Sequence, residues 1–336
     1  MRALLQGSGA EIGFGTGRTS MTTIYMAGHE GMVGRAILRR LEERRMGGEE
    51  ITCLTRERDA LDLREQAAVR HFLQETRPDV IIMAAGRSGG PAVRATAPAD
   101  FIYDTLMMEA NVIHEARSAG VQRMVRFVPA GIYPAGEEGP AQESRSLIDM
   151  LSASSDPHAT AKATGTKLCD YCNRQAGTDY RTMVTADLYG PGGDFDSETG
   201  DLPLAFLHRF HTARNAGQDQ VAIGESDALG SFLHVDDLAD GALFVLDLPK
   251  AEYTAAAGHG YLNIGSEHAI SVSDLAVLAS RVTGYSGRIV RDPARRETRP
   301  SRVLDAGLLA RLGWSPSIGL ADGLAASYDW FFDARG

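Results

Sequence analysis

The sequence predicts an α/β protein built on a doubly wound parallel sheet, with a smaller C-terminal α/β lobe. Apolar runs at residues 22–27, 50–55 and 79–85 have the length and the β-branched content of buried strands. Helical apolar patterns separate these runs, and such alternation is typical of parallel sheets. The third observation is a glycine-spaced turn between the first strand and the first helix.

That turn has the pattern Gly28-x-x-Gly31-x-x-Gly34, and a helical pattern starts at once with Met32 and Val33. Gly28 permits the sharp turn, Gly31 lets a pyrophosphate approach the backbone, and Gly34 lets the helix pack close to the strand. The N-terminus of the helix attracts the anion. The motif predicts a Rossmann-like dinucleotide site, with these five residues against the cofactor.

The end of the second strand decides between the two nicotinamide cofactors. Arg56 and Arg58 follow that strand, and arginines there favour the 2′-phosphate of NADP, whereas an acid binds the ribose hydroxyls of NAD. Glu30, inside the glycine turn, argues for NAD because its charge would repel a phosphate. The sequence favours NADP, with NAD as the alternative.

The remaining elements predict how the chain divides. Long helices are expected over 98–120 and 157–177, and strands over 123–128 and 180–188. Glycine, proline and aspartate then concentrate up to residue 201, which indicates a substrate loop. The expected parts are a disordered extension (1–21), a nucleotide-binding domain (22–190, also receiving parts of 230–265) and a substrate lobe (191–229 and 266–336).

Composition limits the partners and the compartment. The 336 residues include 34 Lys and Arg against 44 Asp and Glu, a formal charge of −10, with no basic run. Nucleic acid and anionic membrane surfaces are therefore not expected partners. Three cysteines make no disulfide framework, which favours the cytoplasm, and Cys169-x-x-Cys172 lies in a helical stretch and is not expected to bind metal. No apolar run reaches the roughly 18 residues of a membrane span.

Longer stretches carry a more specific signal than the glycines: IYMAGHEGMVGRAILRRLE, PADFIYDTLMMEANVIHEA, TKLCDYCNRQAGTDYR, LYGPGGDF and FLHVDDLA. In these stretches the chain resembles the GDP-L-fucose synthases of the extended short-chain dehydrogenase/reductase superfamily, and the resemblance covers nearly its whole length. The resemblance implies a Rossmann domain for NADP(H), a nucleotide-sugar substrate, and a homodimer through the two long helices. It also implies adenine contacts from Asp62 and Leu63, and a cofactor wall from Ala84 and Ala85.

The residues that perform the family's chemistry are mostly replaced. The superfamily's Tyr-x-x-x-Lys pair, which donates the proton and holds the nicotinamide ribose, is His158 and Lys162 here. The carbonyl-polarising serine falls at Pro129, which has neither a hydroxyl nor an N–H. The family's cysteine base falls at Gly131 and its histidine acid at Gly192. Of that catalytic set only the lysine persists.

Three side chains are candidates for the altered chemistry. His158 can exchange a proton near neutral pH, although the same residue can be a helix-start histidine without a chemical role. Asp187 replaces a family asparagine and is a candidate carboxylate base, or a hydrogen-bonded residue at a strand end. Tyr133 is a candidate to stack on nicotinamide or substrate.

Substrate binding is expected from five residues: Arg87, Asp187, His208, Arg209 and Arg295. The family's arginine before FLHVDD aligns with Gly230, and another is replaced by Ser301, while Arg302 is a further candidate cation. Three classes of function stay open. They are an NAD(P)-dependent redox enzyme with altered acid/base groups, a non-redox enzyme that performs elimination, isomerisation or cyclisation, and a non-catalytic nucleotide-binding sensor.

Overall fold

The computed structural model describes residues 21–87, 96–133, 139–143, 156–196, 200–224, 228–266, 268–295 and 303–333. The expected N-terminal extension lies outside these residues, apart from its last position, and so do Ser301 and Arg302.

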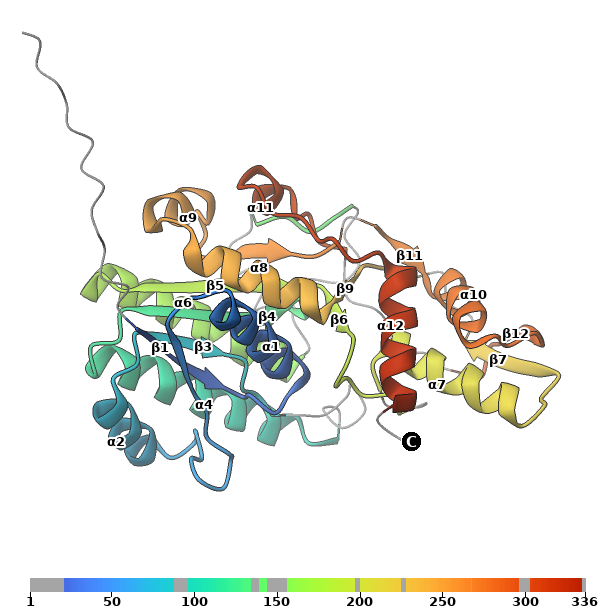
Figure 1. Cartoon of the computed structure of the whole chain (residues 1–336), viewed down its shortest axis with the longest axis horizontal. Helices are drawn as coiled ribbons and strands as arrows, with labels where there is room; N and C mark the ends of the chain where they lie inside the picture. Colours follow the sequence, from blue (N-terminus) through green and yellow to red (C-terminus); the bar gives the residue numbers. More distant parts are fainter. Residues whose placement is uncertain are drawn as a thin grey trace, which may run out of the picture.

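A six-stranded parallel sheet forms the centre of the molecule, in the order β10-β5-β4-β3-β1-β2 (Figure 1). Its strands are β1 (Thr22–Ala27), β2 (Ile51–Leu54), β3 (Val80–Met83), β4 (Arg123–Pro129), β5 (Asp179–Thr185) and β10 (Leu262–Ile264). The order runs in opposite directions from β1, so a crevice opens at the carboxyl ends of β1 and β3. The predicted α/β class with a doubly wound parallel sheet is confirmed.

Helices cover both faces of this sheet (Figure 1). One face packs against α2 (Gln66–Thr76), α4 (Pro98–Ser118) and α6 (Pro157–Ala176), and the other against α1 (Met32–Met46) and α8 (Val235–Asp247). Alternation along β1 explains both cores: Tyr25 and Ala27 join the first, and Ile24 and Met26 join the second. The short helices α9 (Lys250–Ala256) and α11 (Gly307–Arg311) join the same apolar core as β10.

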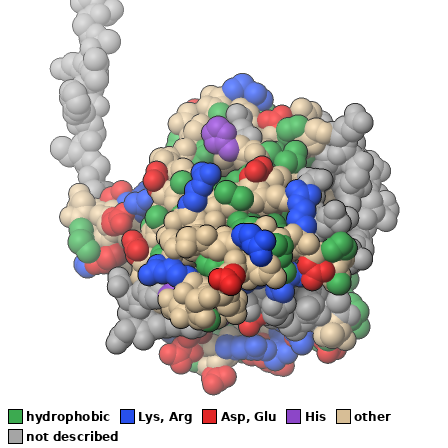
Figure 2. Space-filling view, turned by 90° about the vertical axis from the view of Figure 1, so that its right-hand side faces the viewer, with side chains coloured by type: hydrophobic (Ala, Val, Ile, Leu, Met, Phe, Trp, Pro, Cys, Tyr) green, Lys and Arg blue, Asp and Glu red, His purple; other side chains and the backbone are tan. Residues whose placement is uncertain are grey.

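A separate apolar core holds the second lobe together. Phe206, Phe210, Leu275 and Leu324 belong to it. Its elements are α7 (Leu202–Asn215), α10 (Val272–Thr283) and α12 (Leu320–Asp333), with the parallel pair β7 (Gln220–Gly224) and β12 (Arg288–Asp292) and the antiparallel pair β8 (Leu229–Gly230) and β11 (Ile270–Ser271). On the face of the molecule in Figure 2, acidic and basic side chains are interspersed.

The strand predicted over residues 180–188 is wrong as a single element. β5 ends at Thr185, opposite Pro129, which has no N–H with which to continue the ladder. The chain then forms β6 (Asp187–Tyr189), which pairs in parallel with β9 (Phe232–His234) outside the large sheet. This break carries the chain from the large sheet toward the second lobe.

None of the helices described is long and apolar enough to cross a lipid bilayer.

Candidate active site

Two of the three motif glycines are required by packing. Gly28 has φ +85°, and a Cβ on it would lie 2.6 Å from the Ala85 nitrogen. A Cβ on Gly34 would lie 2.6 Å from the His29 Cα. Any side chain at either position would push the turn away from β3 or from α1.

Gly31 has a different reason to be small. A Cβ there would make an ordinary contact, 3.6 Å from the Gly28 oxygen, so packing alone does not demand glycine. Gly31 caps α1 without a side-chain hydrogen bond to the first-turn N–H groups. These N–H groups and the bare backbone before them form a surface suited to a phosphate.

A pocket, which we call the glycine-turn pocket, opens beside this motif. It collects side chains from the turn, from the segment after β2 and from the segment after β3. Among its lining residues are eight of the expected cofactor residues: Gly28, Gly31, Arg56, Arg58, Asp62, Leu63, Ala84 and Ala85. Glu30, which argued for NAD, also lines it. The other expected cofactor residues, Met32, Val33, Gly34 and Lys162, lie outside this lining.

An ion-pair chain borders the glycine-turn pocket. Arg64 contacts Asp62 at 2.7 Å and Asp104 at 3.1 Å, and Arg87 contacts Asp104 at 2.9 Å. Hydrogen bonds from Arg64 lower the pKa of Asp62 to about 2. Arg56 lies over the ring of Phe72, 5.0 Å from its centroid. Asp104 therefore holds two arginine side chains at the edge of the pocket.

A second pocket, the α6 pocket, adjoins the first. Its lining includes Val33, Pro129, His158, Lys162 and Thr185. Residues 84–87, the segment after β3, line both pockets. The expected proton-transfer residues therefore lie next to the glycine turn, separated from it by one short segment.

The start of α6 explains how His158 reaches this pocket. Asp156 caps the helix, and its side chain accepts hydrogen bonds from the N–H groups of His158 and Ala159. Pro157 occupies the first helical position, where its missing N–H costs nothing. His158 and Lys162 are therefore in successive turns on one face of the helix.

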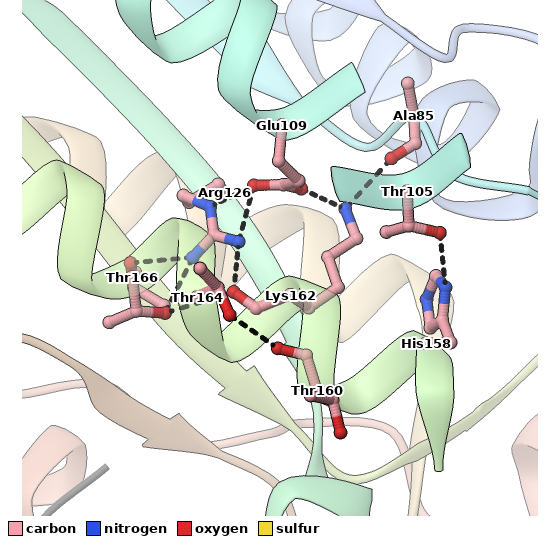
Figure 3. Close-up of polar contacts among 10 residues, drawn as sticks. Ala85, Thr105, Glu109, Arg126, His158, Thr160, Lys162, Thr164 and Thr166 are labelled. Atoms are coloured by element: carbon pink, nitrogen blue, oxygen red, sulfur yellow. Dashed lines mark hydrogen bonds and ion pairs between the residues drawn. The ribbon is translucent and has the colours of Figure 1, made fainter. Parts of the chain in front are cut away.

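Lys162 belongs to a buried network of charges (Figure 3). Its ammonium donates to Glu109 Oε1 at 2.6 Å and to the Ala85 carbonyl at 2.9 Å. Arg126, on β4, donates to Glu109 Oε2 at 2.6 Å, to the Lys162 carbonyl at 2.7 Å and to the Thr166 hydroxyl at 2.7 Å. A carboxylate thus lies between two cations in the interior.

The network shifts the ionisation of its members. Burial by itself would raise the pKa of Glu109, but Arg126 and Lys162 outweigh it, so the pKa is lowered. The pKa of Lys162 is also lowered, chiefly by burial and further by the Arg126 charge, against the opposing effect of Glu109. Glu109 therefore stays ionised while Lys162 releases its proton more readily than an exposed lysine.

Comparison with known proteins identifies the family. Residues 24–265 match the profile of the NAD dependent epimerase/dehydratase family. The chain belongs to this family. It is 37% identical over 318 residues to GDP-L-fucose synthase from Escherichia coli (strain K12), an alignment that covers 94% of this chain and 98% of that protein.

Two solved structures from Campylobacter jejuni extend the family comparison. A GDP-mannoheptose C4 reductase with NADP bound is 29% identical, with a TM-score of 0.77, over 94% of this chain and 99% of that one. A GDP-D-glycero-L-gluco-heptose synthase in the presence of NADPH is 27% identical, with a TM-score of 0.81, over the same shares. The resemblance noted from the sequence is confirmed.

Glu109 and Arg126, the partners in the buried network of Lys162, were not predicted from the sequence. The available signal was Arg126 itself, a charged residue inside the apolar run of β4 (RMVRFVP). A fully buried guanidinium needs an acidic partner. The sequence offers several acidic residues on the helices that cover the sheet, so it does not tell which one is the partner.

Five of the expected catalytic and substrate-binding residues do not line either pocket. Tyr133 is 4% exposed and donates its hydroxyl to Asn263, so its placement gives no support to stacking on a ligand, and we assign it no role in the reaction. The other four are Asp187, His208, Arg209 and Arg295. Asp187 lies in β6, and Nδ1 of His208 contacts the Phe195 carbonyl at 2.8 Å. The Arg209 guanidinium lies 5.1 Å from the centroid of the Phe206 ring, and the backbone N–H of Arg295 donates to the Asp292 carbonyl. Arg87, by contrast, lines both pockets.

Proposed function

We propose that this protein is an NADP(H)-dependent reductase of a keto sugar carried on GDP. One observation carries the proposal: His158 and Lys162 line a pocket that shares residues 84–87 with the glycine-turn pocket. The substrate class is inferred from relatives whose names specify GDP-linked sugars. GDP-L-fucose synthesis itself is not proposed.

The glycine-turn pocket fits the cofactor. Cβ atoms on Gly28 and Gly34 would fill the turn, and Gly31 leaves the backbone at the α1 N-terminus accessible to a pyrophosphate. Arg56 and Arg58 line the same pocket and supply positive charge for a 2′-phosphate. NADP(H) is therefore the proposed cofactor. NAD stays the alternative because Glu30 is also in the lining.

The α6 pocket would supply the proton for the reduction. NADPH, when bound, supplies the hydride that reduces the carbonyl carbon. As an imidazolium, His158 would give its Nε2 proton to the carbonyl oxygen, so a C=O bond becomes a CH–OH group, and the neutral imidazole left behind would take up a proton from solvent. Lys162 has three ammonium protons, of which Glu109 and Ala85 accept two, and it would orient a bound hydroxyl with its third.

Epimerisation is not part of the proposal. It needs an acid and a base beside the sugar ring, and glycines stand at both family positions, Gly131 and Gly192. A Cβ on Gly131 would lie 3.7 Å from the Ala159 Cβ and 3.6 Å from Asp156 Oδ2, and Asp156 already caps α6. We infer reduction without inversion at the neighbouring carbons.

Isotope transfer tests this function. The purified protein is incubated in D₂O with GDP-4-keto-6-deoxymannose and NADPH, and in H₂O with deuterated NADPH. We expect deuterium at C4 from the cofactor and no enzyme-dependent deuterium at C3 or C5. Solvent deuterium at C3 and C5 would show epimerisation. Binding of NADPH without reduction of any GDP-linked keto sugar would favour the non-redox and sensor alternatives.

Assembly and compartment complete the proposal. Tyr103 on α4 and Tyr171 on α6 are 61% and 57% exposed, and we propose that these helices form a homodimer, which sedimentation would test. Cys53, Cys169 and Cys172 are free thiols, which suits the reducing cytoplasm.

A further inference from the structure

Helices α4 and α6 meet beside the α6 pocket with matching spacing. Thr105 and Glu109 are four residues apart on α4, and His158 and Lys162 are four residues apart on α6. Thr105 contacts His158, and Glu109 contacts Lys162, so two successive turns of one helix face two successive turns of the other (Figure 3).

The deeper of these two contacts fixes the register of the helices. The Glu109 carboxylate and the Lys162 ammonium are 2.6 Å apart, and their side chains are 2% and 5% exposed. Arg126 holds the other carboxylate oxygen. A one-turn slip of α6 would leave the Lys162 ammonium buried without its carboxylate partner, which is strongly unfavourable.

The second contact is at the His158 ring. The Thr105 side chain is fully buried, and its Oγ1 lies 3.4 Å from His158 Nδ1. A Cβ on Gly86, in the pocket wall, would lie 3.2 Å from His158 Cε1 and 4.0 Å from Nε2. The ring therefore turns Nδ1 toward α4 and its Cε1–Nε2 edge toward the pocket wall.

We propose that Thr105 is a positioning residue, which holds the His158 imidazole at Nδ1 so that proton transfer takes place at Nε2. This inference rests on the proposed function, in which His158 gives the proton. A hydroxyl both accepts and donates hydrogen bonds, so Nδ1 stays engaged whether or not it carries a proton. The contact is long for a hydrogen bond, as catalytic hydrogen bonds often are in ligand-free structures before substrate binds.

Three variants separate positioning from packing. Thr105→Val keeps the shape of the side chain and removes the hydroxyl, and Thr105→Ser keeps the hydroxyl. Thr283→Val is the matched control, because Thr283 is also fully buried in a helix and its hydroxyl donates to the Ala279 and Ser280 carbonyls of the second lobe.

The first readout does not depend on turnover. Long-range ¹H–¹⁵N spectra of the cofactor-free protein, labelled in histidine, report on Nδ1 of His158, which is assigned by the loss of its signals in His158→Gln. We expect the Nδ1 resonance to move in Thr105→Val and to keep its wild-type position in Thr105→Ser and Thr283→Val. If the Nδ1 resonance of Thr105→Val keeps its wild-type position, the proposal is overturned.

The second readout is kinetic. We expect Thr105→Val to lower kcat about tenfold with the NADPH dissociation constant unchanged, and Thr105→Ser to restore kcat. In a His158→Ala background Thr105→Val should have no further effect, and an equal loss in both backgrounds overturns the positioning role.

The two readouts distinguish the ways to fail. If no keto sugar is reduced, the proposed function fails, while the spectra still decide whether Thr105 holds Nδ1. If Nδ1 responds to Thr105→Val but His158→Ala keeps full turnover, the proton donor is wrong and the positioning role is overturned with it.

Discussion

The glycine-turn pocket and the α6 pocket are built in opposite ways. The first rests on a contiguous motif, in which Gly28 and Gly34 are required by backbone contacts within one turn and its neighbours. The second rests on side chains joined across 53 residues of chain, Thr105 to His158 and Glu109 to Lys162. A local motif can be kept as a block, whereas a reaction site assembled from distant helices changes one residue at a time.

The largest expected effect concerns the buried charges beside the α6 pocket. Glu109→Gln leaves Arg126 and Lys162 without a carboxylate, and we expect the free energy of unfolding to fall by about 3–5 kcal/mol. Glu42→Gln is the control at an exposed ion pair, since Glu42 and its partner Arg45 on α1 are 45% and 57% exposed, and its loss should be far smaller. Urea denaturation measures both, and equal losses would contradict a special role for the network.

The glycine turn offers a sharper contrast within one motif. Gly28→Ala places a Cβ 2.6 Å from the Ala85 nitrogen at a positive φ, and should destabilise the protein by about 1–3 kcal/mol. Gly31 has φ −70° and room for a methyl group, so Gly31→Ala should keep the melting temperature but weaken NADPH binding. Calorimetry of both variants would refute the account if Gly31→Ala bound NADPH normally.

The arginines of the glycine-turn pocket set a prediction on cofactor choice. Replacing Arg56 and Arg58 together by serine removes the charges proposed for the 2′-phosphate, and the NADPH dissociation constant should rise about tenfold or more. The NADH constant should stay within about twofold. Arg45→Ser, on the exposed end of α1, controls for net charge. If binding of NADPH and NADH weakened equally, these arginines would not contact the 2′-phosphate.

The smallest predicted effect is on acid stability. The pKa of Glu109 is lower in the folded protein than its ordinary value of 4.5. Its contribution to stability is therefore complete above about pH 4.5 and is lost as the pH falls through the lower folded pKa. The urea midpoint of the wild type should decline more steeply than that of Glu109→Gln below pH 4.5. Parallel pH profiles would mean that Glu109 does not titrate differently on folding.

The fold and the glycine-turn pocket could be predicted from the sequence. Strand and helix periodicity located the sheet elements, and the glycine spacing located the turn, because both signals are local. The break after Thr185 was missed because it depends on Pro129 in the neighbouring strand, a residue 56 positions earlier.

The sequence predicted only some of the residues at the α6 pocket. His158 and Lys162 were found from the family resemblance, but Thr105, Glu109 and Arg126 were not, since helix packing decides which acid meets which base. Tyr133 stays an untested candidate for stacking on a ligand, and the bond from its hydroxyl to Asn263 could not be read from the sequence.

One measurement tests the contrast between the two pockets most directly: NADPH titration and keto-sugar turnover of the wild type and of His158→Ala. We expect both proteins to bind NADPH with dissociation constants within about twofold, and kcat to fall about 10²–10⁴-fold in the variant. Unchanged turnover in His158→Ala, or a folded wild type that does not bind NADPH, would contradict this expectation.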